Sequence, residues 1–327
     1  MNKDSDCAPS TFMLPKPFRA RAVVVGGGTM GADVAMVLAR AGCQTIVLEL
    51  GEARRQLLDA VFIDGLRKLG VEHKRERISV CASLDAIDWQ CIDLVVECIP
   101  EKLASKQALF AELVRRVRPD TLLCSNSSSF PISAIAVGLD TAERMLGLHF
   151  FMPAHLVPLV EVILGARSSL PLADSVCAFM RACGMVPVLV RKDLPGFVAN
   201  RLQHALAREA FALIDAGVAS PEDIDAAVRF GFGFRFLAAG PVLQRDHAGI
   251  DVHCPAAATM YPSLAANTEP AKALTERLAA GKFGMKSGEG FYKWTSESIA
   301  EERERYQALL IAGLRLLSPE LPKIVDQ

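Results

Sequence analysis

The sequence predicts a doubly wound α/β domain with a mostly parallel sheet, followed by an all-helical C-terminal domain. Two observations carry this prediction. Between residues 22 and 190, short β-branched runs alternate with longer stretches of helical spacing, a pattern typical of buried parallel strands joined by helices. Asp193-Leu194-Pro195-Gly196 then has the composition of a turn, and the longer patterns after it are helical.

Size and composition describe a folded protein of two domains. The 327 residues exceed one ordinary core, and 51% hydrophobic with 22% charged residues is typical of a globular chain. We expect a flexible tail at 1–18, the α/β domain at 19–192 and the helical domain at 193–327. The formal net charge of −1 gives no global field, so we expect neither nucleic acid nor a membrane as a partner.

The cysteines and the N-terminus indicate a cytoplasmic protein. None of the nine cysteines forms a Cys-x-x-Cys pair, so we expect a reducing compartment and no metal site. The first eighteen residues contain three prolines and no apolar run, unlike a signal peptide. No window reaches the roughly 18 apolar residues of a membrane span.

The first predicted strand and helix enclose a glycine-rich motif. Ala22–Val25 is a β-branched run, Gly26-Gly27-Gly28-Thr29-Met30-Gly31 follows at once, and helical spacing continues from Ala32 to Ala41. In this G-x-G-x-x-G arrangement the three glycines permit a tight turn, a close approach of pyrophosphate and close packing of the helix on the strand. The N–H groups at the start of the helix favour phosphate. The motif therefore predicts a dinucleotide site.

Glu49 indicates which dinucleotide binds. It follows a second predicted strand, Gln44–Leu48, at close to the expected spacing of about 20 residues after the glycines. A carboxylate there accepts the ribose hydroxyls of NAD and repels the 2′-phosphate of NADP. We therefore predict a Rossmann-type NAD-binding domain with NAD as its cofactor. Arg54 and Arg55 offer a phosphate contact instead, but we interpret them as helix surface.

The remaining elements follow in order along the chain. Strands are predicted at 78–81, 92–96, 122–124, 144–148 and 185–190, and helices at 52–69, 103–117, 171–183 and 197–216. Ser220 and Pro221 have the pattern of a helix start. The region from Arg67 to Arg77 is strongly basic, and two interpretations stay open: a solvated helix face, or a contact for a phosphorylated carrier.

Polar residues follow three of these strands. Glu97-Cys98-Ile99-Pro100-Glu101 and Ser125–Ser129 come at carboxyl ends, where ligands gather in doubly wound folds. The serine run is equally well interpreted as a turn or helix cap. The strand 144–148 leads into His149, and Glu161 can return beside it across the turn at Pro153. We predict this base and carboxylate as the catalytic pair.

Several separate segments together resemble the L-3-hydroxyacyl-CoA dehydrogenase family. The likeness runs from about residue 20 to residue 294, in the family's order and spacing. Its segments are Gly26–Gly31, Val95–Glu97 with Glu101 and Lys106, Ser125–Ser128, His149–Phe151 with Pro153 and Leu159–Val162, Pro187-Val188, Asp193–Leu202 (DLPGFVANRL) and Lys282–Tyr292 (KFGMKSGEGFY).

The resemblance implies a role for each matched position. His149 is expected to be the catalytic base and Glu161 the carboxylate that orients it, while Ser128 and Asn200 hold the reacting oxygens of the substrate. A homodimer is also implied, with the helical domain binding substrate. The expected cofactor residues are Gly26, Gly28, Thr29, Met30, Gly31, Glu49, Glu101, Lys106, Ser128, Met152 and, closing from the second domain, Lys286.

The residue types fit this chemistry independently of the resemblance. Oxidation of a secondary alcohol needs a base for the hydroxyl proton, and imidazole titrates near neutral pH. An adjacent carboxylate favours the imidazolium and fixes the useful tautomer. Ser and Asn donors stabilise the oxygen as its charge changes. The resemblance implies which alcohol this is: the expected reaction is reversible oxidation of a 3-hydroxyacyl-CoA, such as 3-hydroxybutyryl-CoA, by NAD.

Two departures from the family leave the substrate open. Met152 stands where the family usually has Asn. Gly231–Pro241 (GFGFRFLAAGP) and the helical tail at Glu301–Leu317 look more like carnitine and gulonate dehydrogenases. A small free hydroxy acid is therefore the alternative substrate, and a non-catalytic NAD-binding structural protein is a third hypothesis. An apolar stripe in the tail, expected to be buried, agrees with a homodimer: Leu309, Leu310, Leu314 and Leu317.

Overall fold

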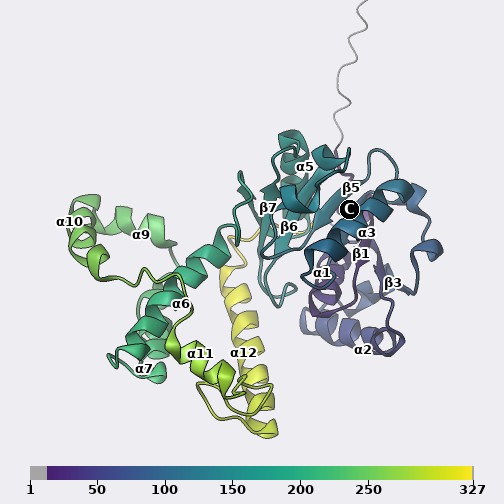
Figure 1. Ribbon diagram of the computed structural model, residues 1–327. Helices are drawn as coiled ribbons and strands as arrows, with labels where there is room; N and C mark the ends of the chain where they lie inside the picture. The colour runs from purple at the N-terminus through teal and green to yellow at the C-terminus, as the bar shows by residue number, and fades with distance from the viewer. Residues whose placement is uncertain (1–12, 326–327) are drawn as a thin grey trace, which may run out of the picture. The chain divides into compact units, whose positions relative to one another are not determined.

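A computed structural model describes residues 13–325. The chain divides into two compact units: one runs to Val198 and takes in the chain again from Ser318, and the other is Ala199–Leu317. Figure 1 shows the sheet unit and the helical unit. The fold class is therefore the one that the sequence predicted.

Within residues 13–325, the first unit contains one eight-stranded sheet. Its strand order is β3-β2-β1-β4-β5-β6-β7-β8, and every neighbouring pair is parallel except β6 and β7, which are antiparallel. The strands are β1 (Arg21–Val25), β2 (Gln44–Leu48), β3 (Ile78–Cys81), β4 (Leu94–Glu97), β5 (Leu122–Ser125), β6 (Met145–Phe150), β7 (Leu159–Leu164) and β8 (Val186–Val190).

Helices cover both faces of this sheet (Figure 1). Buried residues of α1 (Thr29–Arg40), α2 (Glu52–Lys68) and α5 (Leu170–Ala182) share one apolar core with Val24 of β1. Those of α3 (Leu103–Arg116) and α4 (Ile132–Ile135) share a second core with Val23, its neighbour. Successive strand residues point to opposite faces, which is why these strands are continuous apolar runs. Short 3-10 helices complete the unit at Pro17–Arg19, Glu72–Arg77, Leu84–Ala86, Trp89–Cys91 and Ala142–Arg144.

The second unit is helical. Its elements are α6 (Ala199–Asp215), α7 (Pro221–Ala226), a π-helical turn (Ala227–Phe232), α8 (Gly233–Arg235), α9 (Pro241–Ala248), α10 (Ile250–Met260), a 3-10 helix (Tyr261–Ser263), α11 (Lys272–Ala279) and α12 (Ser296–Leu317). The Ser220 side chain accepts a hydrogen bond from the Asp223 N–H, so it caps α7 as its sequence predicted.

The unit boundaries differ from the predicted domain limits. Asp193–Val198 belongs to the first unit because Asp193 accepts the Ser133 N–H and Glu161 accepts the Val198 N–H. At the other end, the Val325 N–H donates to the carbonyl of Ala182. Residues 1–12 of the predicted tail lie outside the described residues. Within its described part, Leu14 is buried and donates its N–H to Ser175 Oγ.

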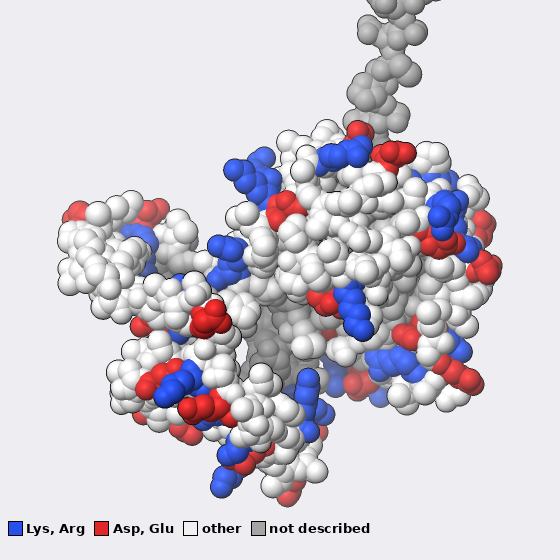
Figure 2. All heavy atoms as spheres, viewed as in Figure 1, with Lys and Arg blue, Asp and Glu red and all other residues white. Residues whose placement is uncertain are grey.

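The second unit buries very little apolar surface by itself. Only Ala239 and Ala273 are buried among residues 199–317, and they are 8% and 4% exposed. The predicted stripe in α12 is therefore not buried: Leu309 is exposed, and Leu310, Leu314 and Leu317 are half-buried. Figure 2 shows a mostly uncharged surface over α9 and α10 on the face in view. Val242 of α9 and Ile250 of α10 are among the exposed large apolar residues of this unit.

Candidate active site

The antiparallel pairing of β6 with β7 brings the predicted base and carboxylate together. His149 and Glu161 are direct partners in the register of β6 and β7. His149 Nδ1 lies 2.9 Å from Glu161 Oε2, and the side chains are 3% and 1% exposed. His149 lies inside β6 rather than after it, since the strand ends at Phe150. The strand pairing thus fixes both side chains on one face of the sheet.

Ser128 lies on the other side of the imidazole. Its hydroxyl is 3.1 Å from His149 Nε2, in the loop that follows β5. An ionised carboxylate only accepts hydrogen bonds, so the contact with Glu161 favours the tautomer with its proton on Nδ1. The Nε2 lone pair then faces Ser128. A proton acceptor and a hydroxyl thus meet at one point, the arrangement that removal of a proton from an alcohol requires.

Glu161 has a second partner that the sequence did not indicate. Its Oε1 accepts the Val198 N–H at 3.0 Å. Phe197 precedes this donor with φ of 50°, a left-handed conformation that costs a bulky residue roughly 1–2 kcal/mol. Gly196 before it has φ of 77°, and it is the last residue of the turn that the sequence predicted at Asp193–Gly196. Phe197 is buried, and its ring centroid lies 5.6 Å from that of His149.

One carboxylate oxygen holds the serine loop. Glu101 Oε1 accepts hydrogen bonds from Ser127 Oγ (2.6 Å), Ser128 N (3.2 Å), Ser129 N (3.0 Å) and Ser129 Oγ (2.7 Å). Burial raises the pKa of Glu101, but the hydrogen bonds from Ser127 and Ser129, with the charge of Lys106, outweigh it and lower the pKa to about 2. Ser128 is therefore held in place by a carboxylate that stays ionised.

Lys106 is enclosed by protein groups. It is 1% exposed, and its ammonium lies 2.7 Å from Glu97 Oε1 and 3.1 Å from Glu101 Oε2. Glu97 also accepts from Ser125 Oγ and from the Ile99 N–H. The ammonium thus joins α3 to the end of β4 and, through Glu97, to Ser125 of β5. The sequence singled out Glu97 by position but not this buried ion-pair network.

The glycine motif leaves an open cradle at the start of α1. A Cβ added to Gly28 would meet nothing within 4 Å, whereas one on Gly31 would lie 1.7 Å from the Gly26 carbonyl oxygen. Gly26 itself has φ of 104°. Thr29 and Met30 begin α1 directly after the cradle. The space above Gly28 and the free N–H groups of the helix fit a pyrophosphate.

Glu49 lies beside this cradle at the end of β2. Its Oε2 accepts the Gly27 N–H at 2.8 Å and its Oε1 accepts the Gly51 N–H at 2.7 Å. Arg54 and Arg55 are bound to backbone carbonyls, at Gly27 and at Glu49 with Leu50. The carboxylate therefore lies where the ribose of a dinucleotide is expected. The N–H groups of the cradle and the Glu49 carboxylate together fit the phosphates and the ribose of NAD.

Three other predicted residues lie elsewhere in the chain. Met152 is 65% exposed in the turn between β6 and β7. Asn200 is the second residue of α6, and Lys286 lies in the loop between α11 and α12, both in the second unit.

Asn126 was part of the predicted polar run. Its Oδ1 accepts the Phe150 N–H at 2.8 Å, and this hydrogen bond joins the serine loop to β6.

The basic stretch is largely neutralised by nearby acids. Arg67 pairs with Glu72, Lys68 with Asp64, Arg75 with Asp59 and Arg77, at 4.0 Å, with Glu76. Such exposed ion pairs are typical of a solvated helix face, the first of the two interpretations left open by the sequence. They leave less free charge for a phosphorylated carrier than the sequence alone indicated.

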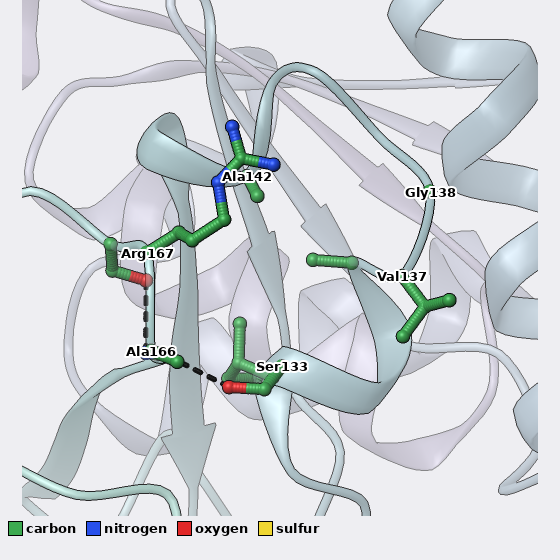
Figure 3. Close-up of a pocket in the computed structure, with 10 residues that line it drawn as sticks. Ser133, Val137, Gly138, Ala142, Ala166 and Arg167 are labelled. Atoms are coloured by element: carbon green, nitrogen blue, oxygen red, sulfur yellow. Dashed lines mark hydrogen bonds between the residues drawn. The ribbon is translucent and has the colours of Figure 1, made fainter.

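The described residues offer less support for a metal site or a nucleophilic cysteine. Among them, no group of three His, Cys, Asp or Glu side chains is placed to hold a metal ion. Burial raises the pKa of the Cys98 and Cys124 thiols well above the usual range, so these thiols are poor nucleophiles. A cavity of about 200 Å³ between α4 and the segment Gly165–Ser168 contains none of the predicted site residues (Figure 3). No helix in residues 13–325 has the length and apolar character to span a membrane.

Family models match both units. The model described as "3-hydroxyacyl-CoA dehydrogenase, NAD binding domain" matches residues 21–194, and that of the C-terminal domain of the same enzymes matches residues 196–294. The chain belongs to the 3-hydroxyacyl-CoA dehydrogenase family. It is an oxidoreductase of this type, acting on CH–OH groups with NAD as its cofactor.

Relatives in this dehydrogenase family differ in their substrates. A 5-formyl-3-hydroxy-2-methylpyridine 4-carboxylate 5-dehydrogenase of Mesorhizobium japonicum is 32% identical over 90% of this chain and 97% of its own. The human mitochondrial hydroxyacyl-coenzyme A dehydrogenase is 36% identical over 90% of this chain and 97% of its own.

Solved structures of the family include both substrate types. One is the crystal structure of a 5-formyl-3-hydroxy-2-methylpyridine 4-carboxylic acid 5-dehydrogenase, described as an NAD+-dependent dismutase. It has a TM-score of 0.84 at 32% identity and covers 91% of this chain and 98% of its own. A (S)-3-hydroxybutyryl-CoA dehydrogenase from Ralstonia eutropha has a TM-score of 0.69 at 29% identity, covering 84% of this chain and 99% of its own.

Proposed function

We propose that His149 is the base of an NAD-dependent dehydrogenation. The observation that carries this proposal is the short chain of contacts from Glu161 through His149 to Ser128, at 2.9 and 3.1 Å. His149 Nε2 takes the hydroxyl proton of the substrate, and the Glu161 carboxylate stabilises the imidazolium that forms. When substrate binds, the Ser128 hydroxyl turns from Nε2 to the reacting oxygen and donates to it, and we assign Asn200 as the second donor. NAD, when bound, supplies the acceptor for the hydride.

We assign the NAD site to the cradle and its neighbours. The pyrophosphate would approach the backbone at Gly28 and the first turn of α1, which includes Thr29 and Met30. Gly26 and Gly31 shape the cradle through the tight turn and the close packing of the helix. Glu49 accepts the adenosine ribose hydroxyls, and its charge excludes a 2′-phosphate. Glu101, Lys106, Ser128, Met152 and Lys286 are proposed at the nicotinamide end, with Glu101 and Lys106 acting through the serine loop that they hold.

The substrate has two candidates. A 3-hydroxyacyl-CoA is the substrate type in the names of two of the four relatives given above, and it is the expectation from the sequence. A small free acid with a CH–OH group, or with an aldehyde whose hydrate presents one, is the candidate that two observations favour. The carboxylate-paired Arg67–Arg77 stretch offers little free charge to the phosphates of CoA, and the fold is more similar to the pyridine carboxylate enzyme. We therefore favour the small free acid.

We also propose a cytoplasmic homodimer. The eight described cysteines are all free, as in a reducing compartment. The second unit exposes many large apolar side chains, among them Phe230, Phe234, Leu243, Val252 and Leu316, more than a monomer usually leaves in water. A second copy of the same unit covers such a surface symmetrically. Sedimentation at micromolar concentration gives twice the chain mass if this is correct, and the chain mass itself contradicts it.

A substrate panel tests the proposal. NADH formation is compared for 3-hydroxybutyryl-CoA, free 3-hydroxybutyrate, carnitine, gulonate and 5-formyl-3-hydroxy-2-methylpyridine 4-carboxylate. Turnover of a free acid alone supports our preference, whereas turnover of the CoA thioester alone supports the other candidate. Arg67→Gln with Arg75→Gln is the accompanying variant, because it raises KM only if CoA phosphates bind there.

A further inference from the structure

The turn between β6 and β7 joins the proposed base to its carboxylate. His149 and Glu161 stand at the two ends of this connection. Phe151, its first residue, places its ring edge-on to His149 with centroids 4.6 Å apart. The turn closes on itself through the Pro153 carbonyl, which accepts the N–H groups of Leu156 and Val157 at 2.9 Å. The position of this turn therefore bears directly on the imidazole.

Asp33 of α1 reaches into the turn from outside. Its Oδ2 accepts the Ala154 N–H at 2.8 Å, and its Oδ1 lies 3.0 Å from Nδ1 of His155. Asp33 is 4% and His155 8% exposed. The imidazole N–H is not aligned on the carboxylate, so this second contact is an ion-pair distance and not a directed hydrogen bond. A buried carboxylate is rarely retained without partners, and here both partners belong to the turn.

Arg40, at the other end of α1, holds the same segment. Its guanidinium donates to the carbonyls of His155 and Cys183, both at 3.3 Å, and contacts the sulfur of Met185 at 3.0 Å. The helix that starts at the dinucleotide cradle is thus fastened at two points to the connection between the proposed base and its carboxylate.

We infer that Asp33, with His155, is a positioning residue for the reaction. This inference rests on the proposed role of His149. Without the carboxylate, the buried Ala154 N–H has no acceptor and the turn must shift to expose it. The shift moves Phe151 and with it the imidazole, and displacements of about 1 Å at a reacting group change rates on the order of 10²-fold. The cradle glycines do not depend on this contact, so NAD binding is preserved.

Two substitutions of Asp33 and one control test the inference. Asp33→Ala removes both contacts, while Asp33→Asn keeps an oxygen for the Ala154 N–H. Ser175→Ala is the matched control, because Ser175 Oγ is also a buried acceptor for a backbone N–H, that of Leu14. We expect both alanine variants to lower Tm. Only Asp33→Ala should lower kcat, by on the order of 10-fold or more, with the Kd for NAD within about threefold of wild type and Asp33→Asn close to wild type.

The outcomes separate this inference from the proposed function. If Asp33→Ala and Ser175→Ala have the same kcat, Asp33 is merely structural and the inference is wrong. If the Kd for NAD rises in step with the loss of kcat, Asp33 acts on the cofactor helix and the inference is also wrong. The test of Asp33 is meaningful only if His149→Ala is inactive, because the inference rests on His149 as the base. If His149→Ala retains turnover, the base assignment fails first and the positioning role fails with it.

Discussion

Glu161 binds His149 with one carboxylate oxygen and the chain leading to α6 with the other. Oε2 lies 2.9 Å from the imidazole, and Oε1 accepts the Val198 N–H at 3.0 Å. The carboxylate is therefore fixed from two directions in a buried place. It can orient the imidazole without having to reorganise during the reaction, which is the condition for effective electrostatic stabilisation.

Neutralising this carboxylate should abolish most of the activity. In Glu161→Gln the amide keeps the size of the side chain, but it no longer stabilises an imidazolium and favours the wrong tautomer. We expect kcat to fall on the order of 10³-fold. Initial-rate measurements and titration with NAD check this, since the Kd for NAD should stay near the wild-type value. A variant with more than about a tenth of wild-type kcat contradicts the role of Glu161.

Two glycine substitutions should separate cofactor binding from folding. Gly28→Ala adds a methyl group where the protein has nothing within 4 Å, so Tm should hold while the Kd for NAD rises at least about tenfold, because the backbone no longer meets the pyrophosphate. Gly31→Ala places a methyl group 1.7 Å from the Gly26 oxygen, so this variant should lose stability. Equal NAD affinity in Gly28→Ala and wild type means that the pyrophosphate lies elsewhere.

Glu49 should set the preference for NAD over NADP. Glu49→Gln keeps an acceptor for the Gly27 N–H but removes the charge that repels a 2′-phosphate. We expect the ratio of kcat/KM for NADP to that for NAD to rise at least about tenfold. If Glu49→Gln has the same NADP-to-NAD ratio of kcat/KM as the wild type, the carboxylate does not face the ribose.

Glu101 should make stability depend on pH below 5. Its pKa is lowered from 4.5 to about 2 in the folded state, so the folded protein holds the carboxylate ionised where the unfolded chain protonates it. The stabilisation is therefore fully present above about pH 5 and is lost as the pH falls towards 2. The difference in urea midpoint between wild type and Glu101→Gln should shrink over this interval. A difference that is independent of pH contradicts the assignment.

Met152 should affect turnover and not folding. Its side chain is 65% exposed, and surface substitutions usually change the free energy of unfolding by less than about 0.5 kcal/mol. Met152→Asn restores the residue that is usual in the family, so we expect kcat/KM for 3-hydroxybutyryl-CoA to rise relative to the free acids. Unchanged kinetics on the whole panel would mean that Met152 does not line the site.

The sequence predicted the parts of the site that depend on local pattern. The strand, glycine motif and Glu49 are close in the chain, and the turn at Pro153 brings Glu161 back to His149. The fold class also follows from these patterns. The contacts of Glu101 with the serine loop were not predicted, because they join the ends of two strands through a network that includes the buried Lys106. Nothing local to Lys106 distinguishes a buried lysine from a solvated one.

Two other features needed the tertiary structure. Phe197 has the sequence setting of a helix residue, yet α6 starts only at Ala199 because the turn before it binds Glu161. The α12 leucines have helical spacing for burial, but spacing does not say what covers them, and in the single chain they are at most half-buried. A pattern of apolar residues predicts a face that avoids water, not the partner that shields it.

The most direct test of the central claim compares wild type with His149→Ala. NADH formation is followed with the best substrate of the panel, and NAD binding is titrated for both proteins. If His149 is the base, His149→Ala binds NAD with wild-type affinity and loses at least about 10²-fold in kcat. A variant that binds NAD normally and turns over at the wild-type rate contradicts the account.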